Sequence, residues 1–175
     1  MSARYLPSAR TAVSKLRRGL DELIQRADDK TLDIEVRSDL ARYACVCVAG
    51  FLEQSLLHCG HAVIHRLSHA AARNYAESHL KRSFNPRARE IVRYVAKFDL
   101  EWGKTLGEWM DETERGHTIN ALIGIRNQIA HGNSQSTTIG RVREYRRVVD
   151  ALVDLLLDLF EPQVGATPGQ VVVGA

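Results

Sequence analysis

The sequence predicts an all-α fold, a bundle of five or six helices without a sheet. Apolar residues recur at three- and four-residue steps through most of the 175 residues, which is the spacing of one helix face. We find no alternation of apolar and polar residues between turns, as in a half-buried strand. Hydrophobic residues make up 45% and charged residues 26%, which is typical of a globular protein. We expect one helical domain over residues 1–160 and a disordered tail, with three Gly and two Pro, over 161–175.

Composition and charge indicate the cellular compartment of the protein more clearly than its function. The formal net charge of +3 is mildly basic and does not by itself require a nucleic-acid partner. We find neither the ~18 uninterrupted apolar residues of a membrane span nor the apolar core of a signal peptide. Cys45, Cys47 and Cys59 fit buried, reduced thiols, and residues two apart on a helix, such as Cys45 and Cys47, point away from each other. We therefore expect a cytoplasmic protein that does not associate with a membrane.

Polar breaks divide the first half of the chain into helices. Apolar periodicity predicts a helix over residues 8–29 and a long second helix over 33–69. Residues 70–81 either continue this helix or form a short separate one. The next helix is expected to start with Asn85 as its N-cap and Pro86 at its first position, since these residue types favour those places.

The second helix carries a long apolar stretch that ends at a carboxylate. From Tyr43 to Leu52 nearly every residue is apolar or small, so this part of the helix is expected to be packed on several sides. Glu53 follows directly, and a carboxylate beside such a run is unfavourable unless it is paired. Glu53 either marks the point where the helix emerges into solvent or faces Arg126 and orients it.

The same helix carries histidines four residues apart on one face, namely His61, His65 and His69. This spacing can supply two metal ligands from neighbouring turns. No Asp, Glu or Cys falls on that face nearby, so the favoured interpretation is a polar, partly exposed histidine stripe. A zinc protein built on His61 and His65 is the alternative. We expect no metal and no cofactor.

The last helix, over residues 142–160, is amphipathic and follows a loop rich in hydroxyl groups. Its outer face is expected to begin basic, with Arg146 among the exposed arginines, and to end acidic at Asp158. A helix over residues 100–114, packed by two tryptophans, precedes the motif described next.

Basic residues also gather around the start of the helix that follows Pro86, where residues 81–97 contain six Lys or Arg side chains and one acid, Glu90. These residues form either a solvated face or a track for RNA phosphates. The side chains that we expect to contact RNA are Arg87, Arg93, Arg141 and Arg143.

The stretch RNQIAHG at residues 126–132 ends the helix before the last one. Gly132 just past the last periodic residue is a common left-handed helix stop. Asn127 and His131 lie four apart on one face, and the long side chain of Arg126 can swing toward the imidazole. A cation, an amide and an imidazole at one helix end can hold and attack a phosphodiester.

This motif resembles the R-x4-6-H signature of the HEPN superfamily. The helix far upstream that carries Gly50-Phe51-Leu52-Glu53 is similar to the helix of that superfamily that carries an acidic residue, and a long amphipathic helix follows the motif. Over residues 37–160 the helix order is closest to the RiboL-PSP-HEPN branch. The resemblance implies an all-α domain, commonly dimeric. Many members are metal-independent endoribonucleases of toxin–antitoxin and phage-defence systems, and others have lost catalysis.

The motif and the resemblance together predict RNA cleavage without metal. His131 is the candidate base for the 2′-hydroxyl, Arg126 binds the phosphate, and Asn127 contacts the phosphate or holds the imidazole. In the family-based interpretation Glu53 orients the arginine and a homodimer places two motifs in one cleft. Three alternatives remain: a structural strut, a zinc protein, and an inactive HEPN dimer that serves as an RNA-binding or regulatory module. An antitoxin or another defence-system protein is a possible partner.

Overall fold

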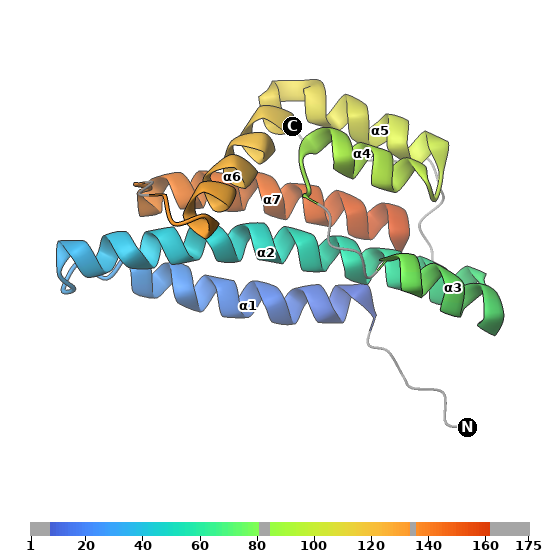
Figure 1. Cartoon of the computed structure of the whole chain (residues 1–175), viewed down its shortest axis with the longest axis horizontal. Helices are drawn as coiled ribbons and strands as arrows, with labels where there is room; N and C mark the ends of the chain where they lie inside the picture. The colour runs from blue at the N-terminus through green and yellow to red at the C-terminus, as the bar shows by residue number, and fades with distance from the viewer. Residues whose placement is uncertain (1–7, 81–84, 134–135, 162–175) are drawn as a thin grey trace.

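Helices make up nearly all of the chain that the computed structural model describes, which comprises residues 8–80, 85–133 and 136–161 (Figure 1). No strand occurs in these ranges, so the predicted all-α class is confirmed. Residues Ile34–Leu67 and Ala70–Leu80 form two helices separated only by Ser68 and His69, and if these two helices are counted as one, the described chain has six α-helices. The elements are α1 (Ala9–Ala27), α2 (Ile34–Leu67), α3 (Ala70–Leu80), α4 (Ala88–Ala96), α5 (Leu100–Asp111), a 3-10 turn η1 (Glu112–Glu114), α6 (Arg115–Ala130) and α7 (Ile139–Phe160).

The long helix α2 is the centre of the fold, with α1 and α7 packed along it (Figure 1). Its start follows from the sequence, because Asp33 accepts a hydrogen bond from the Glu35 amide at 2.8 Å and so caps the helix. Ser8 caps α1 in the same way through the Thr11 amide, at 3.2 Å. Val48 and Leu52 of α2 are fully buried, as the apolar stretch of the sequence predicted.

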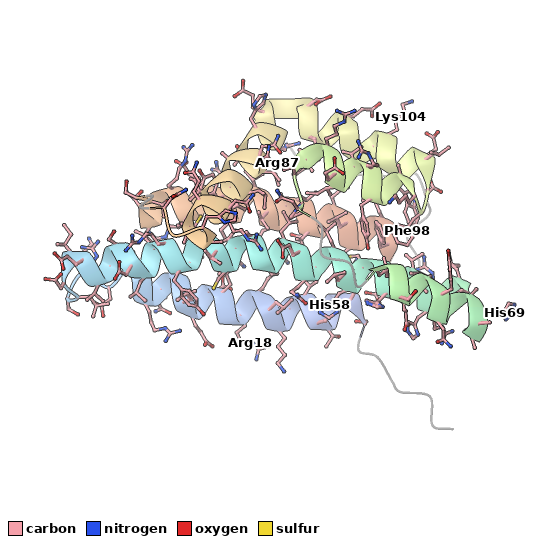
Figure 2. The ribbon with its side chains drawn as sticks, in the orientation of Figure 1. Arg18, His58, His69, Arg87, Phe98 and Lys104 are labelled. Atoms are coloured by element: carbon pink, nitrogen blue, oxygen red, sulfur yellow. The ribbon has the colours of Figure 1, made fainter. Side chains whose placement is uncertain are left out.

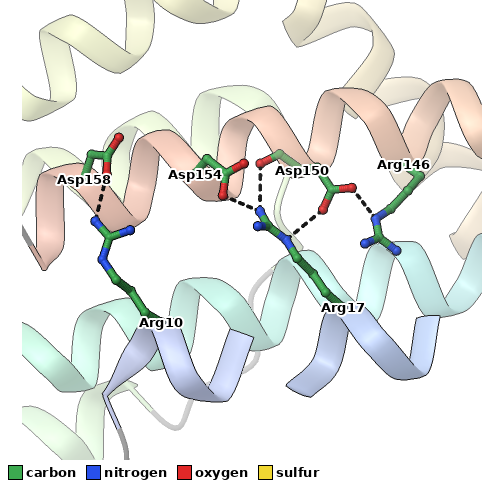
Figure 3. A network of polar contacts seen from close by, with 6 residues as sticks. All are labelled: Arg10, Arg17, Arg146, Asp150, Asp154 and Asp158. Atoms are coloured by element: carbon green, nitrogen blue, oxygen red, sulfur yellow. Dashed lines mark hydrogen bonds and ion pairs between the residues drawn. The ribbon is translucent and has the colours of Figure 1, made fainter. Parts of the chain in front are cut away.

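Ion pairs join α1 to α7 along the acidic face of α7 (Figure 3). The Arg10 guanidinium lies 2.7 Å from a carboxylate oxygen of Asp158, and Arg17 lies 3.0 Å from Asp150 and 2.5 Å from Asp154. The acidic residues of α7 therefore pair with arginines of α1 and link the two helices. Because these pairs are partly exposed, each contributes little stability alone, about 0–1 kcal/mol.

Arg146 lies inside this interface, so its expected place on the outer face was wrong. It is 8% exposed. Its guanidinium is paired with Asp150 at 2.5 Å and with Asp21 at 3.2 Å, and lies over the ring of Phe51 at 5.2 Å. The carboxylates of α1 and α7 provide the compensation that lets the arginine leave water.

The start of α4 also differs from the expectation. The helix begins at Ala88 with Arg87 in the N-cap position, two residues after the predicted cap at Asn85. The Ala88 amide donates to the side-chain oxygen of Asn120, at 3.0 Å. A residue of α6, distant in sequence, thus supplies the cap and ties α4 to the helix that carries the motif.

Helices α4 and α5 form a hairpin that lies over α7 (Figure 1). Aromatic rings fill the contact: Phe98 and Trp102 lie 5.1 and 5.2 Å from the buried ring of Phe160. Within the hairpin the two backbones approach closely at Gly103, where an added Cβ would lie 2.5 Å from the Cβ of Ala96. Gly103 therefore serves the close packing of α5 against α4.

The cysteines were expected to be buried, reduced thiols, and the structure agrees for two of the three. All three are free, and Cys45 and Cys59 are buried, whereas Cys47 is only half-buried. Burial raises the pKa of Cys45 to about 11 and, with the charge of Glu161 as a smaller cause, the pKa of Cys59 to about 12. These two thiols stay protonated and unreactive at neutral pH.

By length and composition α2 could also cross a membrane. The core helix of a soluble protein passes the same test, and half of its most apolar window is buried inside the bundle. Its contacts with α1, α6 and α7 account for this apolar character. The expected tail over 161–175 lies outside the described residues except for Glu161.

Candidate active site

The motif lies at the carboxyl end of α6, and its backbone follows the predicted helix stop. Gly132 has φ +77°, in the left-handed region that glycine adopts readily. Its amide donates to the Ile129 carbonyl, and the Asn133 amide donates to the Gln128 carbonyl, both at 3.0 Å. This pair of bonds is a Schellman motif, which satisfies two of the last helix carbonyls. The chain therefore turns away directly after His131.

Arg126 lies between two oxygen acceptors, one from each of two helices. Its Nη2 is 3.3 Å from Oε1 of Glu53 on α2, and its Nη1 donates to Oδ1 of Asn127 at 3.1 Å. The Arg126 side chain is 33% exposed and that of Glu53 23% exposed. The guanidinium is thus held in place while one part of it still faces solvent. Its remaining N–H groups are available to a phosphate oxygen.

His131 is the C-cap residue of α6 and is exposed. Its amide donates to the Asn127 carbonyl at 3.0 Å, which fixes the backbone. Within the described residues its imidazole has no hydrogen-bond partner. The side-chain oxygen Oδ1 of Asn127 accepts a hydrogen bond from Arg126 instead. One chain therefore brings Glu53, Arg126 and Asn127 together and leaves the imidazole one turn away, on the surface.

The four arginines expected to contact RNA are all exposed, but they differ in their partners. Arg93 pairs with Glu90 and Arg141 with Glu144, each within its own helix, and Arg143 pairs with Asp28 at 2.6 Å. This contact, more than any other, lowers the pKa of Asp28. Arg87 has no such partner in the described part of the chain.

Arg87 also lies near the motif helix (Figure 2). The neighbouring Ala88 is bonded to Asn120, six residues before Arg126 on α6. Six residues correspond to about 9 Å along a helix. Arg87 therefore lies within reach of an extended polyanion that contacts Arg126.

The histidine face of α2 contains a group that the sequence did not assign to it. Glu77 of α3 reaches back to His65, with Oε1 2.7 Å from Nε2 of the imidazole. Side-chain donors of His61, His65 and Glu77 lie within 4.8 Å of one another. His58, one turn earlier, has a lowered pKa, mainly because of burial and also because of His61. Residue spacing along the chain could not predict that Glu77 lies beside His65, because this contact depends on how α3 folds back onto α2.

An all-α bundle in which an acidic residue of a central helix holds the arginine of an R-x4-H helix end defines a HEPN-type domain. The family model described as RiboL-PSP-HEPN matches residues 12–162, and the chain belongs to this family. No curated protein and no solved structure gives a significant match. Membership of this family suggests an RNA-cleaving or nucleotide-binding function, and HEPN domains commonly dimerise and bind RNA.

Proposed function

We propose that the protein is a metal-independent endoribonuclease that acts at a site shared by two copies of the chain. The observation that carries the proposal is the fixed arginine. Arg126 is oriented by Glu53 at 3.3 Å and by Asn127 at 3.1 Å, and it lies one turn from an exposed imidazole. Phosphodiester cleavage needs a positioned cation and a base, and an imidazole can serve as that base.

In the proposed reaction the imidazole of His131 removes the proton of an RNA 2′-hydroxyl. The 2′-oxygen then forms a bond to phosphorus, the bond from phosphorus to the 5′-oxygen breaks, and a second imidazole protonates the leaving oxygen. Arg126 stabilises the negative charge that grows on the phosphate oxygens. The products are a 2′,3′-cyclic phosphate and a 5′-hydroxyl.

A homodimer supplies the second imidazole. One chain carries a single His131, and it lies at an exposed helix end where a partner can approach. A two-fold axis near this end would bring two motifs into one cleft. The arginines Arg87, Arg93, Arg141 and Arg143 would then guide the RNA backbone, with Arg87 the most available of them.

A biological setting follows from the same proposal. We infer a cytoplasmic toxin–antitoxin or phage-defence protein, whose activity an antitoxin or another defence-system protein holds in check. The proposed catalytic residues need no cofactor for this reaction.

A second function is favoured by one observation, namely that the His131 imidazole has no hydrogen-bond partner among the described residues. An imidazole that nothing orients suits a dimer that has lost catalysis and binds RNA or a partner protein. In that case the arginines would hold the RNA without cleaving it.

Product analysis tests the proposed chemistry. An end-labelled RNA is incubated with the full chain and a chelator, and the new ends are identified by their sensitivity to phosphatase and kinase. Fragments with a 2′,3′-cyclic phosphate and a 5′-hydroxyl are expected. Ends with a 5′-phosphate would overturn the mechanism, and RNA binding without cleavage would support the inactive module.

A further inference from the structure

Helix α3 is fastened to the last turns of α2 by polar contacts. Arg73 donates to the carbonyls of His65 at 3.2 Å and Ser68 at 3.1 Å, and the Ser68 hydroxyl donates to the Ile64 carbonyl. These contacts fix the angle at which α3 leaves α2. They place one face of α3 against the histidine face of α2.

Three side chains of types that can bind a metal meet between these helices, two from α2 and one from α3. A ring nitrogen of His61, one of His65 and a carboxylate oxygen of Glu77 lie within 4.8 Å of one another, and all three residues are half-buried. The shortest of these separations is 2.7 Å, between Nε2 of His65 and Oε1 of Glu77. Figure 2 labels His58 and His69, which lie before and after His61 and His65 in the sequence.

We propose that His61, His65 and Glu77 bind one zinc ion, which joins α3 to the end of α2. Two imidazoles and one carboxylate, with a water molecule in the fourth position, form a donor set that zinc accepts. In a tetrahedral site with ligand distances of about 2.0–2.2 Å, neighbouring ligand atoms are about 3.3 Å apart. The hydrogen bond between His65 and Glu77 has to open slightly, and the wider separations have to close. Each change is at most about 1.5 Å, which side-chain rotations can supply.

The environment of the cluster fits a hydrated ion that enters from solvent. The side chains of His65 and Glu77 are 29% and 26% exposed, so a metal ion can reach them. Because the two helices already hold these side chains close together, less conformational entropy is lost when the ion binds. His69, which the sequence placed on the same stripe, lies beyond the end of α2 and outside the cluster, which makes it a suitable control.

The zinc site is separate from the proposed RNA site. His61 and His65 follow Glu53 by 8 and 12 residues on α2, which is about 12–18 Å along the helix. The ion would stabilise the α2–α3 junction and take no part in cleavage. Failure of one proposal therefore leaves the other intact.

Zinc titration of the full chain, without a polyhistidine tag and after removal of metals by a chelator, tests the site. A chromogenic chelator competes for the ion, and the melting temperature is followed in parallel. We expect one Zn²⁺ per chain and a higher melting temperature with zinc. His61→Gln, His65→Gln and Glu77→Gln should each weaken binding by more than about 100-fold, because loss of even an outer-shell partner weakens it by 10–100-fold.

The control and a second readout make the outcome decisive. His69→Gln should bind zinc as the unchanged protein does, and Co²⁺ should give the absorption of a tetrahedral site only in the unchanged protein and in this control. His65→Gln should retain RNA cleavage. Circular dichroism shows whether each variant is folded. Zinc binding that is absent in the unchanged protein, or that the folded His65→Gln and Glu77→Gln variants retain, would overturn the site.

Discussion

At the scale of single residues, the orientation of Arg126 connects the fold to the proposed chemistry. The guanidinium is held by a carboxylate from α2 and an amide from its own helix. A pair that is one-quarter to one-third exposed adds only about 0–1 kcal/mol of stability. If the contact serves catalysis, its removal should therefore affect the rate much more than the fold.

Glu53→Gln tests this directly. The variant should keep its melting temperature within a few degrees and cleave RNA roughly 10–100-fold more slowly, because a misplaced catalytic group loses rate steeply with distance. Glu108→Gln, which changes an exposed carboxylate of α5, provides the matched control. Equal cleavage by both variants would remove the orienting role of Glu53.

Pairing with Arg126 was one of two alternatives that the sequence left open for Glu53, and in the structure the two side chains meet. The sequence predicted the wrong surroundings for Arg146, because helical periodicity alone placed this arginine outside. Its burial depends on Asp21 and Phe51, which lie on other helices. Pairing between distant segments is not visible in local periodicity, and for the same reason Glu77 was missed beside His65.

At the scale of helices and turns, the ends that carry their own caps were predictable. Asp33 and Gly132 lie where the sequence placed a helix start and stop. The start of α4 was not predictable, because Asn120 of a distant helix satisfies its amide. A sequence shows the capping residue only when that residue is a close neighbour in the chain.

The hairpin of α4 and α5 gives an element-scale prediction that contrasts two glycines. Gly103→Ala places a Cβ 2.5 Å from Ala96, so it should destabilise by about 1–3 kcal/mol despite the better helix propensity of Ala. Gly19→Ala meets nothing within 4 Å on α1 and should stabilise by about 0.5–1 kcal/mol. Denaturant unfolding of both variants measures the difference. An unchanged or raised stability of Gly103→Ala would show that the helices do not pack this closely.

The turn between α5 and α6 has an unusual backbone. Thr113 and Glu114 both have positive φ, 52° and 58°, without being glycine. Each such residue costs roughly 1 kcal/mol or more and persists because the packed helices on both sides hold it. The turn sets the direction of α6 and so contributes to the position of the motif.

At the scale of the whole molecule, the proposed reaction depends on two chains. Static light scattering at micromolar concentration should give twice the mass of the 175-residue chain. Because the second imidazole comes from the partner, cleavage per chain should fall as dilution dissociates the dimer. A monomer that cleaves RNA at full rate would contradict the shared site.

The most direct measurement of the central claim is RNA cleavage by His131→Ala, followed together with the melting temperature and the light-scattering mass. His117→Ala, which removes another exposed imidazole of α6, is the matched control. Loss of the general base should lower the rate by about 10²–10⁴-fold in His131→Ala. Fold and mass should stay unchanged, and the control should cleave normally. A well-folded His131→Ala that cleaves RNA as fast as the control would contradict the catalytic role of His131.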